Sequence, residues 1–370
     1  MRRVLVTGGA GFIGTNFVYY WLNHYPEDLV VVLDALTYAG NLSNLREAEK
    51  RPNFKFVHGN ICNRELVEYL LREFNIDTIV NFAAESHVDR SIIGPDAFIK
   101  TNIQGTHALL QAARQVWIGT DSSREPIPHR FHHVSTDEVY GSLGPDDPPF
   151  TETTPYAPNS PYSASKAASD HLVRAFHHTY GLDVTTSNCS NNYGPFQFPE
   201  KLIPLVIINI LNASPLPIYG DGLNVRDWLY VDDHCRGIDL VICKGKSGEV
   251  YNIGGGNEWT NIEIVRLICK HVDMAVKENP ELVHAFPNTP AATGRSSQDL
   301  ITYVKDRPGH DRRYAIDPEK CERELGYRAE TDFNRGIRLT VKWYLEHMEW
   351  WKEILDGSYR QWVAMQYGTI

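Results

Sequence analysis

Two side chains with complementary acid–base chemistry lie four residues apart in the segment 160–166, which reads Ser-Pro-Tyr-Ser-Ala-Ser-Lys. The apolar residues after it recur at helical spacing, and Pro161 suits the first turn of a helix. Because positions i and i+4 share one face of a helix, the phenol of Tyr162 and the ammonium of Lys166 are expected side by side. A neighbouring cation favours the phenolate, so Tyr162 is predicted to act as a base near neutral pH. On this pattern alone, a buried Tyr beside a solvated Lys stays an open alternative.

A glycine-rich turn near the N-terminus predicts a dinucleotide site. The β-prone run 4–6 leads into Gly8, Gly11 and Gly14, and a helical pattern follows. Glycines let the backbone approach a pyrophosphate, and the helix N-terminus offers free N–H groups. A second strand, 30–33, ends at Asp34, where an acid can bind a ribose 2′-hydroxyl and would repel a 2′-phosphate. NAD is therefore predicted over NADP, with a tight turn that binds no ligand as the alternative.

The elements that must position these groups alternate along the first half of the chain. Strand patterns at 54–57, 78–82, 130–134 and 184–187 are separated by helical patterns, among them 66–74 and 99–115. Such alternation predicts an α/β fold with a Rossmann-type doubly wound parallel sheet. Ligands of these sheets bind at the carboxyl ends of the strands, which would bring the glycine loop, Asp34 and residues 83–86 to one edge. Residues 121–128 are expected to form an exposed polar loop.

A hydroxyl and two carboxyls follow the predicted strand 130–134, as Thr136, Asp137 and Glu138. At a strand end beside a cofactor, these groups could bind a substrate and move protons. Two close carboxyls raise one another's pKa unequally, which can leave one as an acid and the other as a base. Solvated acids at the start of a loop are the alternative interpretation.

Composition limits the possible classes of protein. The 370 residues, 42% hydrophobic, are enough for two domains: a cofactor domain at 1–190, to which residues about 225–255 return, and an interleaved, smaller α/β substrate domain at 191–370. The net charge of −10 argues against nucleic-acid binding. The sequence contains no long apolar run and no signal-peptide pattern, so no membrane contact is expected. Six scattered cysteines without a Cys-x-x-Cys pair predict reduced thiols and a cytoplasmic protein, and no metal site is expected at His129, His132 and His133.

The glycine spacing together with Tyr-x-x-x-Lys resembles the extended short-chain dehydrogenase/reductase family. Within it, the segments 84–89, 135–141, 190–195, 200–204, 226–228, 251–255 and 306–311 look like the dTDP-glucose 4,6-dehydratases, and the similarity covers almost the whole chain. One departure is Asn60-Ile61, where the family usually has Asp-Ile; little change beyond a modest effect on cofactor affinity is expected. The resemblance implies a homodimer formed by two helices of each subunit, one of which carries Tyr162.

The same resemblance implies a reaction with no net oxidation. NAD would take a hydride from C4 of dTDP-glucose, water would be eliminated across C5 and C6, and the hydride would return to C6. Tyr162 would remove the O4 proton, Thr136 would hold O4, and Lys166 would hold the nicotinamide ribose. Glu138 would take the C5 proton and Asp137 would protonate the leaving hydroxyl. The product is a 4-keto-6-deoxy sugar nucleotide.

The remaining predicted binding residues come from the matching stretches. The cofactor set, besides Tyr162 and Lys166, is Gly8, Gly11, Phe12, Ile13, Gly14, Asp34, Ala35, Leu36, Thr37, Asn60, Ile61, Phe82, Ala83, Ala84, Glu85, Ser86, Thr101 and Asn192. The substrate set is Ser86, Thr136, Asn191, Lys201, Leu202, Pro217, Ile218, Tyr219, Arg226, Asn261, Asp306, Arg307, His310 and Tyr314. Of these, the cations Lys201, Arg226 and Arg307 suit a pyrophosphate in an otherwise acidic protein.

Three alternatives stay open at this stage. The nucleotide could be UDP or CDP, because thymidine rests on resemblance alone. A nucleotide-sugar 4-epimerase or decarboxylase would share Tyr162 and Lys166 but has no use for the adjacent Asp137 and Glu138. A non-catalytic NAD-binding regulator would be expected to lack the Tyr or the Lys, and both are present.

Overall fold

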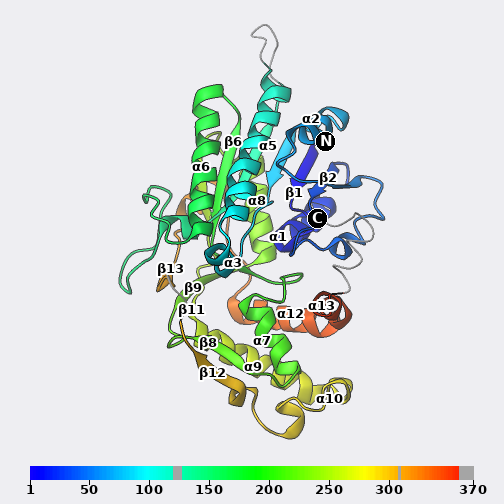
Figure 1. The fold of residues 1–370 in the computed structure, drawn as a ribbon, viewed down its shortest axis with the longest axis vertical. Helices are drawn as coiled ribbons and strands as arrows, with labels where there is room; N and C mark the ends of the chain where they lie inside the picture. Colours follow the sequence, from blue (N-terminus) through cyan, green and yellow to red (C-terminus); the bar gives the residue numbers. More distant parts are fainter. Residues whose placement is uncertain (120–126, 307–309, 358–370) are drawn as a thin grey trace.

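The computed structural model describes residues 1–119, 127–306 and 310–357, and a seven-stranded parallel sheet forms its larger half (Figure 1). The strand order is β10-β6-β5-β4-β1-β2-β3. The strands are β1 (Arg3–Thr7), β2 (Leu29–Asp34), β3 (Phe54–His58), β4 (Thr78–Asn81), β5 (Arg130–Thr136), β6 (Val184–Cys189) and β10 (Val250–Ile253). Strand order reverses between β1 and β4, the position at which such sheets bind ligands.

Helices cover both faces of this sheet, and its central strands β1 and β2 are mostly apolar. On one face, α1 (Phe12–His24) and α8 (Val231–Lys244) pack over β-strand residues such as Val4, Val30 and Val32. On the other face, α2 (Arg64–Glu73), α5 (Thr106–Ala113) and α6 (Pro161–Tyr180) pack over Leu5 and Val31. Because successive side chains of a strand point to opposite faces, the sheet has one apolar layer on each face.

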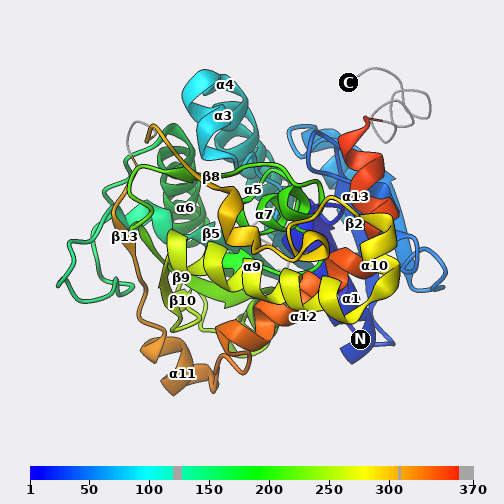
Figure 2. The same ribbon diagram turned by 90° about the horizontal axis from the view of Figure 1, so that it is seen from below.

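The smaller half contains two short sheets and a layer of helices. Strands β7 (Asn191–Tyr193), β9 (Val225–Tyr230), β11 (Glu258–Thr260) and β13 (Arg313–Tyr314) form one sheet, and β8 (Leu216–Tyr219) pairs with β12 (Ile301–Val304). Figure 2 shows α9 (Asn261–Glu278) beside α12 (Phe333–Glu346), and these two helices and α7 (Leu202–Leu211) share a core with α13 (Met348–Leu355). The other helices are α3 (Val88–Ile93), α4 (Asp96–Phe98), α10 (Pro280–Ala285) and α11 (Glu319–Leu325).

The predicted Rossmann-type sheet with a smaller α/β region is confirmed, and each strand predicted from the sequence pairs within the large sheet. The segment predicted as one helix at 99–115 is part of a helical run from 96 to 118 that includes two π-helical stretches, Ile99–Gly105 and Arg114–Ile118. Chain segments alternate between the two halves: β9 belongs to the smaller sheet, whereas α8 and β10, directly after it, complete the larger one. The predicted polar loop at 121–128 falls mostly outside the described residues.

Within the described residues, no helix is long and apolar enough to cross a membrane. All six cysteines are free thiols. In the same ranges, no group of three His, Cys, Asp or Glu side chains is arranged to hold a metal ion.

Candidate active site

The backbone of the glycine loop between β1 and α1 leaves no room for a Cβ at Gly8 or Gly14. Gly8 has φ +68°, and a Cβ there would lie 2.7 Å from the backbone nitrogen of Ala83. A Cβ on Gly14 would lie 2.3 Å from the carbonyl oxygen of Gly8. Gly11 precedes the first turn of α1, so the free N–H groups of that turn face the loop. The loop therefore forms a concave backbone surface at a helix N-terminus, which suits a pyrophosphate.

Asp34 ends β2 with both carboxylate oxygens fixed by backbone donors. Ala10 N–H donates to Oδ2 at 2.9 Å, and Leu36 N–H donates to Oδ1 at 2.8 Å. Burial raises the pKa of Asp34, and these two hydrogen bonds oppose that rise. The carboxylate keeps further lone pairs for a ribose hydroxyl, and none of the described residues lining the cavity beside it is an arginine that could accept a 2′-phosphate.

These groups line one cavity of about 320 Å³ at the carboxyl edge of the large sheet. Every residue of the predicted cofactor set lines it except Leu36. The Leu36 side chain is buried in the core, and only its backbone supports the site, through Asp34. The close glycine turn, the fixed Asp34 carboxylate and the small residues Ala83 and Ala84 fit an NAD molecule lying along this edge.

Helix α6 brings the catalytic pair into the same cavity. Ser160 and Ser163 form a reciprocal capping box and Pro161 occupies the first turn, which explains why the helix begins directly before Tyr162. Tyr162 and Lys166 both line the cavity and are 8% and 4% exposed. The predicted placement on one helix face is thus present, and the interpretation of Lys166 as a solvated surface residue is wrong.

Lys166 was predicted to lower the pKa of Tyr162, but the pKa of Tyr162 is raised in the structure. Burial raises the pKa of Tyr162 well above its ordinary value, and the charge of Glu138 raises it further, while a hydrogen bond with Thr136 lowers it. The Lys166 ammonium donates instead to the carbonyl of Val134 at 2.8 Å. The physical reason is that the cation is bound to the sheet, whereas Glu138 is the charge that acts most strongly on the phenol.

The predicted acid and base adjoin Tyr162 at the end of β5. Thr136 caps a short 3₁₀ turn, Asp137–Tyr140, and its hydroxyl accepts from Glu138 N–H at 3.3 Å. Burial, followed by the charges of Glu138 and Asp227, raises the pKa of Asp137 well above its ordinary value. Asp137 Oδ2 is buried without a hydrogen-bond partner in the described part of the chain. Asp137 is therefore suited to hold a proton and donate it, whereas Glu138 is only half-buried.

The predicted substrate residues divide into two groups. Ser86, Thr136, Asn191 and Lys201 line the cavity, and Asn191 Oδ1 is buried with no partner among the described residues. The other described members of the set lie outside it, in the smaller half, and several contact one another. The Arg226 guanidinium lies 4.3 Å from the centre of the Tyr314 ring, and His310 Nδ1 lies 2.7 Å from Asp306 Oδ1. Asn261 starts α9.

The nucleotide-base surface predicted at residues 217–219 is only partly present. Tyr219 is 41% exposed and stacks edge-on to His310 with ring centres 6.2 Å apart. Ile218 is buried in the core of the smaller half, because alternate residues of β8 face opposite sides. Leu202 packs against the same core. Arg307 lies outside the described residues.

Several cavity residues were not predicted, chiefly Tyr38, Cys189, Phe198 and Glu200. Arg90 links two of them: its guanidinium lies 3.9 Å from the Tyr38 ring centre, and its Nη2 lies 3.3 Å from Glu200 Oε2. These contacts join the loop after β2, helix α3 and the segment before α7 at the cavity. From the sequence, Glu200 could have been indicated because it begins the matching stretch 200–204.

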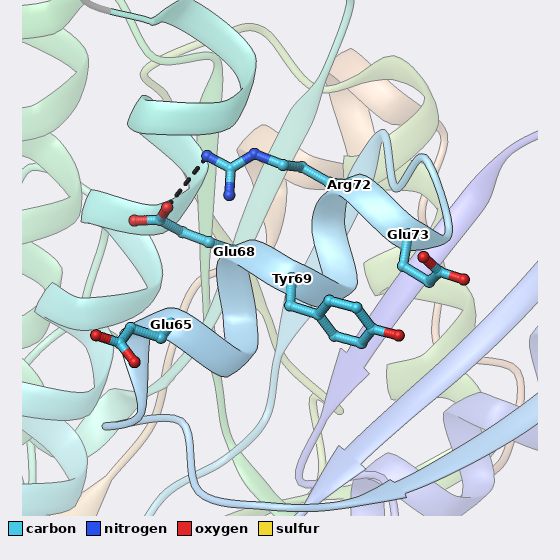
Figure 3. A pocket seen from close by; sticks show the side chains of 5 residues that line it. All are labelled: Glu65, Glu68, Tyr69, Arg72 and Glu73. Carbon is cyan, nitrogen blue, oxygen red and sulfur yellow. Dashed lines mark hydrogen bonds and ion pairs between the residues drawn. The ribbon is translucent and has the colours of Figure 1, made fainter.

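A second, open hollow lies elsewhere, along α2, and is lined by Glu65, Glu68, Tyr69, Arg72 and Glu73 (Figure 3). All five side chains come from one helix, and Arg72 is paired with Glu68 at 3.1 Å. One helix cannot enclose a ligand, and neither the glycine loop nor the catalytic residues line this hollow.

Comparison with known proteins agrees with this geometry. A family model described as GDP-mannose 4,6 dehydratase matches residues 5–340. A dTDP-glucose 4,6-dehydratase of Xanthomonas campestris pv. campestris (strain B100) is 57% identical, over 97% of this chain and 98% of the relative. The chain belongs to the dTDP-glucose 4,6-dehydratase family.

Solved structures of this family support the cofactor assignment. A dTDP-glucose 4,6-dehydratase of Streptomyces venezuelae, crystallised with NAD bound, is 49% identical with a TM-score of 0.82, over 95% of this chain and 99% of that one. A UDP-glucose 4-epimerase of Thermotoga maritima is 27% identical with a TM-score of 0.77, over 94% of this chain and 99% of that one. The dehydratase family thus shares its fold with epimerases.

Proposed function

We propose that this chain is an NAD-dependent enzyme that converts dTDP-glucose to dTDP-4-keto-6-deoxyglucose and water. The observation that carries the proposal is the arrangement of Tyr162, Lys166, Thr136, Asp137 and Glu138 around one cavity beside the glycine loop and Asp34. A 4-epimerase needs the Tyr and Lys, but it has no step for a buried protonated acid and a second carboxyl. The epimerase alternative is therefore disfavoured by the chemistry of Asp137 and Glu138.

Different residues of the cavity would bind different parts of NAD. The glycine loop would hold the pyrophosphate, Asp34 a ribose hydroxyl, and Lys166 the nicotinamide ribose. When bound, NAD⁺ accepts a hydride from C4 of the sugar and returns it to C6 after elimination, so no oxidant is consumed. A cofactor that is regenerated in every turnover can stay bound.

Tyr162 begins the oxidation by removing the proton from the C4 hydroxyl. Thr136, in hydrogen-bonding contact with the Tyr162 phenol, is placed to hold the same oxygen. Because burial and Glu138 raise the pKa of Tyr162, the rate of this step should increase with pH until the phenol is deprotonated.

The ketone formed at C4 makes the C5 proton acidic, and elimination then needs one base and one acid. Glu138 takes the C5 proton, and Asp137 donates its proton to the leaving C6 hydroxyl, which departs as water. When the hydride is returned to C6, protonated Glu138 gives a proton back to C5. The raised pKa of Asp137 keeps that proton in place at neutral pH. The two carboxyls thus perform opposite roles because only one of them is fully buried.

We further propose thymidine as the base and a homodimer as the assembly. Thymidine is supported by relatives at 50–57% identity that carry this substrate in their names. The dimer would use α5 and α6, which lie side by side on one face of the sheet (Figure 1). Light scattering after size exclusion should give twice the mass of one chain, and a monomeric mass would contradict the proposed assembly.

The activity is tested by incubating the purified protein with glucose linked to dTDP, UDP, CDP or GDP. A 4-keto-6-deoxy product should form fastest from dTDP-glucose, without added NAD, and mass spectrometry of the denatured protein should release NAD. Release of NADP, stoichiometric consumption of added NAD⁺, or a 4-epimer as product would contradict the proposed function. A faster reaction with another nucleotide would overturn only the choice of thymidine.

A further inference from the structure

The ammonium of Lys166 lies in the protein interior rather than in water. Its side chain is 4% exposed, Nζ donates to the Val134 carbonyl at 2.8 Å, and it lies 3.4 Å from His133 Nε2. An isolated buried ammonium is strongly disfavoured unless an opposite charge compensates it. The mechanism assigns Lys166 a role toward the cofactor but does not account for how its charge is maintained.

A buried carboxylate lies one turn further along α6, at Asp170. Its side chain is 6% exposed, and Ser135 Oγ donates to Oδ2 at 2.7 Å. Its Oδ1 lies 3.3 Å from His133 Nε2. Two residues of β5, Ser135 and His133, therefore lie against this carboxylate.

The hydrogen bonds of His133 show which of its nitrogens faces Asp170 as a donor. Asn81 Oδ1 accepts from Thr7 Oγ1 at 2.6 Å, so its amide Nδ2 faces His133 Nδ1, at 3.1 Å. Nδ1 must then be the acceptor, which leaves the ring proton on Nε2, directed at Asp170. Burial and the charge of Lys166 lower the pKa of His133 to about 4, so the ring is neutral at working pH. His133 Nε2 lies near both Lys166 Nζ and Asp170 Oδ1, and the neutral ring adds no charge between them.

We propose that Asp170 is a positioning residue that supplies the counter-charge of the buried Lys166 ammonium from the next turn of α6. The proposal rests on the proposed function, in which the Lys166 ammonium holds the nicotinamide ribose. Burial lowers the pKa of Lys166, and Asp170 acts in the opposite direction. The other titratable groups facing this pair are Cys189 of β6, Tyr140 and Tyr156; burial raises the pKa of each, so they are neutral and cannot replace Asp170.

The test is the pH dependence of the oxidation step in Asp170→Asn. NADH formation from bound NAD⁺ is followed by absorbance after rapid mixing with dTDP-glucose, a step in which Asp137 takes no part. Without the carboxylate, Lys166 should lose its proton at lower pH. The alkaline limb of the rate should move down by about one pH unit or more, a roughly tenfold loss at a fixed alkaline pH. A uniform loss at every pH, or an unmoved limb, would overturn the proposal.

A matched control separates this effect from the general cost of changing a buried Asp. Asp273, in α9 of the smaller half, is 8% exposed and accepts hydrogen bonds from the neutral donors Ser296 and Ser297. Asp273→Asn should leave the alkaline limb where it is. If it moves the limb as far as Asp170→Asn does, the proposal fails.

A double-mutant cycle with Lys166→Met tests whether Asp170 acts through the lysine. In the Lys166→Met background, adding Asp170→Asn should change the remaining oxidation rate less than twofold, because the group it acts on is gone. Additive losses would show that Asp170 acts independently of Lys166. If Lys166→Met alone oxidises dTDP-glucose at the normal rate, the proposed function of Lys166 fails instead.

Discussion

At the scale of single residues, Tyr162 carries the first proton transfer. Tyr162→Phe removes the hydroxyl and keeps the ring, which lies 6.3 Å from that of Phe98. We expect kcat to fall by about 10²–10⁴-fold with KM for dTDP-glucose nearly unchanged. Steady-state kinetics measures both values, and a variant that keeps more than about a tenth of the wild-type turnover would exclude this role.

Glu138 distinguishes elimination from simple oxidation. In Glu138→Gln, NADH should still form in a single turnover, while product formation and exchange of the C5 hydrogen with deuterated solvent should fall by roughly 10²–10⁴-fold. Because the charge of Glu138 raises the pKa of Tyr162, the acid limb of NADH formation should also move to lower pH. Dehydration at the wild-type rate, or failure to form NADH, would mean that another group is the base.

The raised pKa of Asp137, which suits it to donate a proton, should also lower the stability of the fold. Its pKa is raised in the folded state, so the folded protein binds more protons than the unfolded chain above the ordinary Asp range. Stability is then lost as pH rises, by about 1.4 kcal/mol for each pH unit over which the two states differ by one proton. Asp137→Asn should therefore melt at a higher temperature than wild type, with a difference that increases from pH 4 to pH 8. A constant difference in melting temperature would contradict the raised pKa.

At the scale of elements, local patterns predicted the site best. The glycine spacing, the acid after β2 and the i, i+4 pair on α6 are each contained in one turn or one helix, so sequence alone placed them. Contacts between distant segments were not predictable: Arg90 and Glu200 are 110 residues apart. The pKa of Tyr162 was predicted with the wrong sign because it depends on burial and on which neighbour Lys166 contacts, and neither is encoded in the spacing.

The glycine loop gives a prediction at this scale. Gly14→Ala places a Cβ against the carbonyl oxygen of Gly8, and both are backbone positions that cannot move apart cheaply. We expect the purified variant to lose most of its bound NAD, measured by mass spectrometry after denaturation. Gly94→Ala is the control, because φ there is −143° and the nearest atom to a Cβ is 4.0 Å away. Equal NAD content in the two variants would mean that the loop does not hold the pyrophosphate.

At the scale of the whole molecule, the two halves are not consecutive pieces of chain. The large sheet receives α8 and β10 only after the chain has passed through the smaller sheet. A fragment of residues 1–190 would therefore leave the apolar residues that α8 covers exposed, and β6 without its outer partner. We expect that fragment to bind a hydrophobic dye and to unfold without a cooperative transition. A cooperative melt measured by circular dichroism would show that 1–190 folds alone.

This interleaving has a consequence for the growing chain on the ribosome. By the time residue 190 has been synthesised, six strands of the large sheet are available, but β6 remains an open edge until Ile253 follows about sixty residues later. Translation at roughly 5–20 residues per second makes that interval several seconds. During those seconds the unpaired edge of β6 can pair with another nascent chain. Slow codons between 190 and 253 should therefore lower the yield of soluble protein more than the same codons placed after residue 253.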